Sequence, residues 1–493
     1  MNLLTRVVVP SRLALICRGP DTLGYNPGLN TWEPLSEEAA ELLRWLRAGR
    51  DRTRLADHFQ ERFGYSATEA SATVRRILEW CVLRRMLYLE QQPEVAIPTY
   101  DKHQVVSVYW ICTQACNLRC AYCYQNAAHA RSNELSTAEA MTLVDQTVDL
   151  GANGFIFTGG EPFVRSDLLD IARYARARGL GTSVITNGHY ISADNAAEVA
   201  QLFDGISVSL DSGTARHHDN CRGKGSWEKA AEAIDLLLAA GATVDVNSVL
   251  THFGLADVEE LISFVRARRI REHRIVPQFP MGRGGAHRSR PADLTPSEVL
   301  GLNTRLRNAD SACTTTEASP LSPEGTNTKK MVRRTHCGAG LSEVSVDPEG
   351  WVFPCRLLQY PRFRTDNVRE RPLTEIVANH PALKGIRATV VDRLEPCKTC
   401  IIKYHCGGGC RGIQFSFTHD YVKAHPLFCA YLRSSFEEQA WNSSGMEPQP
   451  RRAEFAQTTA AGVPKRRGAV RSPTSSPSRV LVVPHAETSE VLS

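Results

Sequence analysis

The sequence predicts an α/β protein built on a parallel sheet, with a small N-terminal unit before the sheet and a cysteine-rich segment after it. Residues 100–290 alternate six short β-rich runs with helical patterns, which is the order that builds a parallel sheet with crossover helices. The chain of 493 residues is long enough for roughly two to four domains. Most of its 15 cysteines gather near residue 120 and within residues 336–432.

Composition and charge exclude several classes of protein. The formal net charge is +5, from 58 basic and 53 acidic residues, and most of the excess lies after residue 450. The folded body is therefore close to neutral, which argues against nucleic acid as a partner. No run of about 18 apolar residues exists, so the sequence predicts no membrane-spanning helix. The N-terminus lacks a signal-peptide core because Pro10, Ser11 and Arg12 interrupt it, and we expect a cytoplasmic protein without a membrane partner.

Residues 1–92 are predicted to form a small unit of strands followed by helices. Two strand-like pieces precede a turn-rich stretch at 24–31, which contains Asn-Pro-Gly. Three helical patterns follow this stretch. Ser36 is a suitable N-cap for the first helix, which has acidic residues in its first turn, and Gly64 ends the second. Residues 92–99 contain two prolines and predict a linker.

Six apolar, β-rich runs supply the predicted strands of the central region. They span residues 105–111, 155–158, 182–186, 206–210, 244–250 and 274–278. Continuous apolar runs of this length are typical of strands that are covered on both faces. Between the first two runs, Ser136 and Glu139 form a capping box that starts a helix, and Gly151 ends that helix.

The chain changes character after the last of these strands. Residues 291–335 are polar and predict a linker region with one helix and a loop. Residues 336–432 are dense in cysteine and show little periodicity, so we expect bound metal to provide their core. Residues 446–493 are rich in Pro, Ser, Arg and Ala and predict a disordered tail.

The first cysteine cluster follows the first predicted strand. Cys116, Cys120 and Cys123 are spaced C-x3-C-x2-C, and three thiolates on one tight loop can bind three corners of a cubane iron–sulfur cluster. The fourth iron then stays open to an outside ligand. A structural zinc site would require a fourth protein ligand, and zinc or buried thiols remain the alternatives. Cys112 lies within the predicted strand and is expected to be a buried thiol.

The segment from Cys116 to Tyr124 (CNLRCAYCY) resembles the signature of radical S-adenosylmethionine (radical SAM) enzymes. This resemblance implies a partial (β/α)6 TIM barrel, which agrees with the six predicted strands. It also implies that the open iron chelates the methionine moiety of S-adenosylmethionine. Electron transfer from the reduced [4Fe–4S] cluster then yields a 5′-deoxyadenosyl radical that abstracts a hydrogen atom from the substrate. Barrels of parallel strands place their chemistry at the carboxyl ends of the strands.

Further positions at strand ends match the same family. Thr158–Pro162 (TGGEP) resembles the motif that binds the amino group of S-adenosylmethionine, and Pro280–Gly284 resembles a turn that follows the sixth strand. By resemblance, Asn187 lies near the ribose, and Ser209 and Arg222 contact the cofactor's carboxylate. The residues expected to bind S-adenosylmethionine are Tyr122, Gly159, Gly160, Glu161, Asn187, Ser209 and Arg222.

The second cysteine cluster resembles the seven-cysteine pattern of SPASM domains. It runs from Cys337 through Gly350 to Cys355, continues with a C-x2-C-x5-C-x3-C motif from Cys397, and ends at Cys429. The resemblance implies two auxiliary [4Fe–4S] clusters. The distal cluster would be held by Cys397, Cys400, Cys406 and Cys429. The proximal cluster would be held by Cys337, Cys355 and Cys410. Cys313 is the candidate for a fourth ligand, and the alternative is a site that stays open to substrate. A zinc ribbon remains the alternative.

Residues 1–92 resemble the small peptide chaperone of pyrroloquinoline quinone biosynthesis, a winged-helix-like domain that recognises leader peptides. The resemblance lies in the order of strands and three helices, with Leu46–Gly49 closing the first helix. It implies that a leader adds as an edge strand beside the third helix. Arginines of the third helix could meet an acidic leader; they are Arg75, Arg76, Arg84 and Arg85. The alternatives are a simple capping domain and a DNA-binding winged helix, and the near-neutral body argues against the latter.

Together these resemblances imply a radical SAM/SPASM enzyme that modifies a ribosomally synthesised precursor peptide carrying a leader. Hydrogen abstraction would lead to a carbon–carbon, thioether or ether cross-link, with electrons supplied by a reducing partner such as flavodoxin or ferredoxin. One alternative is maturation of a larger protein, of the sulfatase formylglycine or quinohaemoprotein type. Another is a non-catalytic iron–sulfur scaffold that binds peptide. The sequence names no general base, and Cys17, Cys81 and Cys221 are interpreted as buried or incidental thiols.

Overall fold

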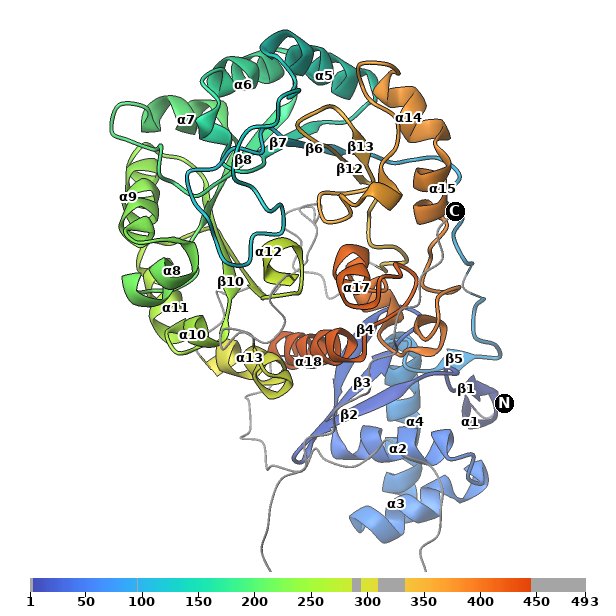
Figure 1. Ribbon diagram of the computed structural model, residues 1–493. Coiled ribbons are helices and arrows are strands. Elements are labelled where there is room, and N and C mark those ends of the chain that lie inside the picture. The colour runs from blue at the N-terminus through green and yellow to red at the C-terminus, as the bar shows by residue number, and fades with distance from the viewer. Residues whose placement is uncertain (1–2, 95, 286–293, 309–332, 445–493) are drawn as a thin grey trace, which may run out of the picture. The chain divides into compact units, whose positions relative to one another are not determined.

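The computed structural model describes residues 3–94, 96–285, 294–308 and 333–444 (Figure 1). The candidate ligand Cys313, most of the loop predicted before residue 335, and the predicted tail 446–493 lie outside the described residues. Within the described ranges, no helix is both long and apolar enough to cross a membrane.

The N-terminal unit contains a three-stranded antiparallel sheet and three longer helices. Its elements are α1 (Leu3–Arg6), β1 (Val7–Val8), β2 (Ala14–Arg18), β3 (Asp21–Asn26), β4 (Thr31–Leu35), α2 (Glu37–Arg47), η1 (Arg52–Arg54), α3 (Leu55–Phe63), α4 (Ala67–Leu83) and β5 (Tyr88–Leu89). Strands β2, β3 and β4 pair in chain order, and β1 pairs with β5. Ser36 caps α2 as predicted, because its hydroxyl accepts a hydrogen bond from the backbone of Ala39 at 3.2 Å.

The turn predicted at 24–31 is shorter than expected. Residues Gly24 to Asn26 belong to β3, and only residues 27–30 connect β3 to β4. The Asn26 side chain accepts a hydrogen bond from the backbone of Gly28 at 3.1 Å, which fixes this turn. Gly24 does not mark a turn; a Cβ there would lie 3.1 Å from the sulfur of Met86, so the missing side chain makes room for packing inside the unit.

Six parallel strands form most of an eight-stranded sheet whose order is β11-β10-β9-β8-β7-β6-β12-β13. They are β6 (Ser107–Ile111), β7 (Gly154–Thr158), β8 (Gly181–Thr186), β9 (Gly205–Ser209), β10 (Val244–Leu250) and β11 (Glu272–Pro277). Each lies within about two residues of a predicted run. Strands that follow one another along the chain pair in parallel, which confirms the predicted partial (β/α)6 barrel.

Helices follow the strands, and most of them ring the outside of this sheet, whereas α12 lies within the ring (Figure 1). They are α5 (Thr137–Asp149), η2 (Pro162–Val164), α6 (Leu168–Ala177), α7 (Ala196–Leu202), α8 (Ala215–Arg222), α9 (Ser226–Ala239), α10 (His252–Leu255), α11 (Val258–Ala267), α12 (Gly282–Gly285) and α13 (Pro296–Asn308). The predicted capping box of Ser136 and Glu139 starts α5. Trp110, Phe155 and Phe157 on the first two strands are fully buried, which explains their continuous apolar runs.

The cysteine-rich segment adds two strands to the same sheet. Strand β12 (Glu343–Val346) pairs in parallel with β6, with Glu343 opposite Ser107, and β13 (Val352–Phe353) pairs antiparallel with β12. The segment's other elements are η3 (Pro361–Phe363), α14 (Leu373–Asn379), α15 (Pro381–Arg387), η4 (Cys397–Thr399), α16 (Lys403–Cys406), α17 (Arg411–Thr418) and α18 (Pro426–Ser443). Both strands are too short to produce a periodic pattern, so the sequence did not predict them.

Burial contributes more to this segment than the sequence predicts. Apolar side chains from β12, α14, α15 and α18 join the core of the barrel, among them Val344, Leu373, Ile376, Leu383 and Phe428. We expected bound metal to provide the core of residues 336–432; among the described residues, apolar side chains also form part of that core. The segment packs on the barrel through a shared hydrophobic core and through the β6–β12 pairing.

Candidate active site and cysteine clusters

Cys116, Cys120 and Cys123 lie on the loop that follows β6, at the carboxyl end of the strand. Their side chains are partly buried. Burial is the largest cause that raises the pKa of the Cys116 thiol to about 11, and the nearby charges of Cys120 and Cys123 contribute to this shift. The loop therefore brings the three predicted thiols into one group. Among the other cysteines, Cys81, Cys112 and Cys221 are buried, whereas Cys17 is exposed.

The Gly-Gly turn after β7 passes directly against the start of this loop. Gly160 donates a hydrogen bond to the carbonyl of Thr113 at 2.8 Å, and Glu161 donates one to the carbonyl of Ala115 at 2.9 Å. A Cβ at Gly160 would lie 2.0 Å from the Ala115 oxygen. Only glycine allows this approach, which sets the position of Glu161 relative to the cysteine loop.

The Glu161 carboxylate is buried between the ends of β7 and β8. It accepts hydrogen bonds from the hydroxyl of Thr186 at 2.7 Å, the backbone of Asn187 at 2.7 Å and the backbone of Phe163 at 3.2 Å. Burial raises the pKa of Glu161 to about 7, although these hydrogen bonds oppose the shift. A buried carboxylate favours a cationic partner, so this site fits the amino group of S-adenosylmethionine.

Asn187 connects the end of β8 to the cysteine loop. Its side-chain amide donates a hydrogen bond to the Oδ1 atom of Asn117 at 2.8 Å, and its own Oδ1 atom accepts one from the backbone of His189 at 3.0 Å. Asn117 directly follows Cys116 in the chain. Three predicted site segments, the cysteine loop, the TGGEP turn and the Asn187 turn, are therefore joined by hydrogen bonds at one end of the barrel.

Asp211 organises the predicted site residues that lie at the end of β9. Arg222 binds its carboxylate through Nε at 2.6 Å and Nη2 at 3.0 Å, and the Tyr122 hydroxyl also donates to this carboxylate. The backbone of Val249 donates a further hydrogen bond at 2.9 Å. Ser209 is the last residue of β9. No cofactor role was predicted for Asp211, although its place just after a strand was the signal that could have identified it.

Arg283 is a second residue whose role the sequence did not predict. It lies on α12, within the turn 280–284, and donates hydrogen bonds to the carbonyls of Cys120 at 2.9 Å and Ala127 at 2.8 Å. Gly282 has a left-handed φ of 52°, and a Cβ there would lie 2.3 Å from the Cys123 carbonyl oxygen. The turn after β11 therefore closes against the cysteine loop and fixes two of its carbonyl groups.

The four predicted ligands of the distal cluster also lie together. Cys397 lies on η4, Cys400 on the loop between η4 and α16, Cys406 on α16 and Cys429 on α18. Burial is the largest cause that raises the pKa of the Cys406 thiol to about 12, and the charges of the other three cysteines contribute to this shift. Nη2 of Arg433 lies 3.8 Å from the sulfur of Cys400.

Two of the three predicted proximal ligands lie next to each other. Cys355 is buried, and the charge of Cys337 adds to the burial that raises its pKa. Burial raises the pKa of the Cys337 thiol, and the nearby Arg411, the residue after Cys410, opposes this shift. Cys410 itself is the N-cap of α17.

A buried polar group lies between the first cysteine loop and the proximal cysteines. The Arg356 guanidinium lies over the ring of Tyr109, 4.7 Å from its centroid, and it also experiences the charges of Glu343, Tyr124 and Cys355. Burial raises the pKa of Glu343, and the charge of Arg356 opposes this shift. Because Tyr124 follows Cys123 and Arg356 follows Cys355, this group connects the two cysteine sites.

The donors of the predicted cluster sites are cysteine thiols, the ligands that iron–sulfur clusters use. Zinc also binds thiolate sulfur, at about 2.3 Å. Across residues 3–94, 96–285, 294–308 and 333–444, no three Cys, His, Asp or Glu side chains lie close enough together to hold a single ion. The chemistry of the donor sets therefore fits iron–sulfur clusters.

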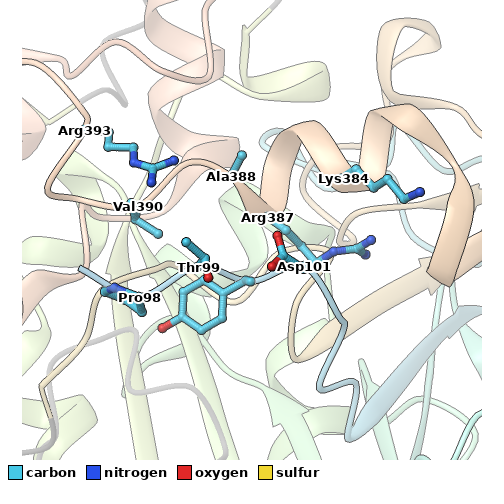
Figure 2. A pocket seen from close by; sticks show the side chains of 9 residues that line it. Pro98, Thr99, Asp101, Lys384, Arg387, Ala388, Val390 and Arg393 are labelled. Atoms are coloured by element: carbon cyan, nitrogen blue, oxygen red, sulfur yellow. The ribbon is translucent and has the colours of Figure 1, made fainter. Parts of the chain in front are cut away.

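Two cavities are lined by residues other than the cysteines. Figure 2 shows one of about 340 Å³ between the linker residues 98–101 and α15. Arg387 lines it but donates hydrogen bonds to the carbonyls of Gly340 at 3.1 Å and Val377 at 2.9 Å, which is a structural role. The second cavity, of about 450 Å³, is lined by residues of the N-terminal unit and by Lys403 and Tyr404.

The fold and the grouped cysteines together define an iron–sulfur enzyme that uses S-adenosylmethionine. Residues 110–265 match the family model of the radical SAM superfamily, and residues 337–401 match that of the SPASM iron–sulfur cluster-binding domain. The chain therefore contains a radical SAM domain followed by a SPASM domain, as the sequence motifs predicted.

Relatives of two kinds are similar to this chain. The AdoMet-dependent heme synthase of Methanosarcina barkeri is 27% identical over 346 residues, which cover 66% of this chain and 96% of the relative. The mycofactocin maturase MftC of Mycobacterium tuberculosis is 28% identical over 316 residues, which cover 63% of this chain and 79% of the relative. The two relatives differ in the substrates that their names imply.

Solved structures show the same fold. Streptococcus suis SuiB bound to S-adenosylmethionine aligns with a TM-score of 0.52 and 15% identity, covering 85% of this chain and 99% of that chain. The anSMEcpe structure with bound AdoMet aligns with a TM-score of 0.55 and 17% identity, covering 69% of this chain and 100% of that chain.

Proposed function

We propose that this enzyme modifies a ribosomally synthesised precursor peptide and forms a carbon–carbon, thioether or ether cross-link within it. The observation that carries the proposal is the N-terminal unit, which stands before a complete radical SAM and SPASM arrangement. SuiB, whose fold covers 85% of this chain, has also been solved with its precursor peptide SuiA. The mycofactocin maturase relatives support a peptide substrate in the same way.

Residues at the carboxyl ends of the strands would hold the cofactors. Cys116, Cys120 and Cys123 would bind three irons of the first cluster, and Glu161 would balance the amino group of S-adenosylmethionine. Asn187 would lie near the ribose. Tyr122, Ser209 and Arg222 would position the cofactor's other groups, with Gly159 and Gly160 giving the backbone room. When bound, this pair of cofactors supplies a 5′-deoxyadenosyl radical that takes a hydrogen atom from the substrate.

The SPASM cysteines would hold two auxiliary [4Fe–4S] clusters. The grouping of Cys397, Cys400, Cys406 and Cys429 supports a closed distal site with four thiolates. Cys337, Cys355 and Cys410 would supply three ligands of the proximal site, with Cys313 as the fourth. The buried Arg356 guanidinium lies near residues next to both sites, Tyr124 and Cys355, and the auxiliary clusters would supply centres that can accept an electron. Flavodoxin or ferredoxin would supply the reducing electrons.

The N-terminal unit would bind the leader of the precursor peptide. Strand β2 is an edge of the three-stranded sheet, which is the feature that strand addition requires. Exposed arginines of α4 and its C-terminal end lie on the same unit; they are Arg75, Arg76, Arg84 and Arg85. Arg84 lies 3.7 Å from Glu33, so the remaining three are the better candidates for an acidic leader.

The extent of the relatives helps to separate the alternatives. Almost the whole heme synthase aligns with 66% of this chain, and the whole of anSMEcpe aligns with 69%. Each of the two proteins therefore leaves about a third of this chain without a counterpart. A tetrapyrrole substrate is the second candidate function because the heme synthase relatives match over nearly their full length.

The decisive assay uses anaerobically reconstituted protein with S-adenosylmethionine and a reductant. Peptides encoded by short reading frames beside the gene and iron coproporphyrin are offered as separate substrates. The proposal expects a peptide that loses two hydrogen atoms while 5′-deoxyadenosine forms in step with the product. Conversion of the tetrapyrrole with every peptide unchanged would establish the second candidate instead.

A further inference from the structure

The three-stranded sheet of the N-terminal unit is buried on both faces. In the register, Tyr25 pairs with both Ala14 and Trp32, whereas Gly24 pairs with Leu15 and Glu33. Because side chains alternate along a strand, these two sets point to opposite faces. Leu15 and Leu35 on one face pack into the helical core of the unit. The other face carries Ala14, Ile16, Leu23, Tyr25 and Trp32.

This second face packs against the distal cysteine group. Leu23, Tyr25 and Trp32 form one hydrophobic cluster with four residues of the SPASM region, and Cys400 and Cys406 pack against that cluster. The four residues are Ile402, Phe436, Ala440 and Trp441. Tyr25 and Phe436 have ring centroids 4.7 Å apart.

Aromatic rings continue this contact towards the cysteines. Trp32 lies edge-on to Phe436 at 5.7 Å between centroids, and it lies 6.4 Å from the ring of His405. His405 directly precedes Cys406 in the chain. Tyr25 is fully buried, and its hydroxyl donates a hydrogen bond to the side chain of Asn30 at 3.0 Å. The hydroxyl therefore has its hydrogen-bond partner within the N-terminal unit.

Polar contacts hold the two parts together at the edges of the apolar contact. Arg18 on β2 and Glu438 on α18 form an ion pair at 3.2 Å, with side chains only 7% and 6% exposed. Arg18 also lies over the ring of Trp441, 5.0 Å from its centroid. Arg12 donates a hydrogen bond to the carbonyl of Lys398 at 2.6 Å, between Cys397 and Cys400 in the chain. A buried ion pair of this kind fixes one relative position of its two elements.

We propose that Tyr25 and Trp32 of the N-terminal sheet are the outer wall of the distal cluster site, excluding water from Cys400 and Cys406 and holding the cluster's reduction potential down. The inference rests on the proposed function, because it requires a cluster at the four distal cysteines. Reduction adds negative charge to a thiolate-bound cluster, and an apolar environment disfavours that charge. The unit that would bind the leader is therefore also part of a redox site.

The test measures the potential and the stability of the distal cluster in the full chain. A parent variant with Cys116, Cys120 and Cys123 replaced by Ala retains only the auxiliary clusters. Tyr25→Ala and Trp32→Ala are made in this parent, and each protein is titrated electrochemically while its electron paramagnetic resonance signals are followed. We expect one auxiliary signal to move to a more positive potential and the other to stay in place. Iron should also pass to a chelator several-fold faster than in the parent.

Matched variants separate this effect from a general loosening of the N-terminal unit. Leu15→Ala removes an apolar side chain from the same sheet on its opposite face and should leave the potential unchanged. Tyr25→Leu keeps an apolar wall and should fold and shift the potential less than Tyr25→Ala. Unchanged potential and iron release in Tyr25→Ala and Trp32→Ala would overturn the proposal. An equal shift in Leu15→Ala would overturn it as well, because loosening alone would then account for the effect.

A further pair of variants distinguishes a failure of this inference from a failure of the proposed function. Cys400→Ala and Cys406→Ala in the same parent should each lower the iron content by about one cluster. If both variants keep the full iron content and both auxiliary signals, the distal cysteines hold no cluster and the proposed function is at fault. If they lose a cluster while the wall variants change nothing, only the wall is disproved.

Discussion

Asp211 binds Arg222 through both carboxylate oxygens, at 2.6 Å and 3.0 Å, directly beside the cysteine loop. The two side chains are only 5% and 10% exposed, so neither charge is compensated by water. Through the Tyr122 hydroxyl, the pair also contacts the segment between Cys120 and Cys123. The end of β9 and the start of the first cluster loop therefore form one electrostatic unit.

Breaking this pair should destabilise the protein strongly. Asp211→Asn leaves a buried guanidinium without its counter-charge and should lower the free energy of unfolding by about 3–5 kcal/mol. The matched control is Asp235→Asn, because Asp235 and Arg268 form the same two-bond geometry at 2.7 Å and 3.0 Å with side chains 53% and 28% exposed. The control should cost less than about 1 kcal/mol. Equal losses in denaturant titrations of the two variants would contradict this account.

A single methyl group at Gly160 should disrupt the cofactor site. The added Cβ would lie 2.0 Å from a backbone oxygen of the cysteine loop, so the backbone must move, at a cost of about 1–3 kcal/mol. We expect Gly160→Ala to weaken binding of S-adenosylmethionine by roughly tenfold, which is about 1.4 kcal/mol. Gly301→Ala on α13 meets nothing within 4 Å and should be neutral or slightly stabilising. Calorimetric titration with S-adenosylmethionine measures the affinity of both variants. Normal binding by Gly160→Ala would count against the close contact between Gly160 and the backbone of the cysteine loop.

His273 should make the stability of the barrel depend on pH. It is buried on β11, and burial lowers its pKa from 6.5 to about 4. Because the folded-state pKa lies below the unfolded value, the unfolded state takes up the proton first as the pH falls. The stability that comes from the neutral ring is complete above pH 6.5 and is lost as the pH falls towards 4. At about pH 5 the loss amounts to roughly 2 kcal/mol.

His273→Asn should therefore show a smaller fall in the free energy of unfolding between about pH 7 and about pH 5 than the parent does. Denaturant titrations at both pH values give the fall in the free energy of unfolding for the parent and for the variant. Other buried histidines, such as His218, titrate equally in both proteins, so the difference isolates His273. An equal fall in the free energy of unfolding for parent and variant would contradict this account, because the His273 ring would then take up its proton in the folded state as well.

Charge reversal on α4 tests leader recognition. Arg75 and Arg76 are exposed, and replacing both with Glu should weaken binding of an acidic precursor peptide by about tenfold at low salt and by less at high salt. Lys423→Glu, an exposed change of the same sign on the SPASM region, should have little effect. Fluorescence anisotropy with a labelled precursor provides the affinities. Equal weakening by both changes would indicate a nonspecific charge effect.

Local signals in the sequence were sufficient for much of the fold. The six β-rich runs, the Ser36 cap and the Ser136–Glu139 capping box depend on neighbouring residues, and the structure contains all of them. The spacing of the cysteines likewise indicated which thiols belong together. These features need no knowledge of distant contacts, which explains why they could be predicted.

The features that were missed are contacts between distant parts of the chain. Strand β12 is four residues long and takes its place only by pairing with β6. Arg283 reaches the carbonyl of Cys120 across 163 positions of sequence, and Arg18 meets Glu438 from the other end of the chain. From the sequence, we predicted an N-terminal unit that is separate from the cluster-binding parts of the chain. The packing of Tyr25 near Cys400 and Cys406 leaves no local pattern that would have revealed otherwise.

The central claim is that Cys116, Cys120 and Cys123 hold the cluster that cleaves S-adenosylmethionine, independently of the SPASM cysteines. The most direct measurement is 5′-deoxyadenosine formation by the reconstituted variant in which all three are replaced by Ala, with dithionite as reductant and iron content determined on the same sample. The account predicts no 5′-deoxyadenosine, with iron retained by the C-terminal cysteines. Continued release of 5′-deoxyadenosine by this variant would contradict it.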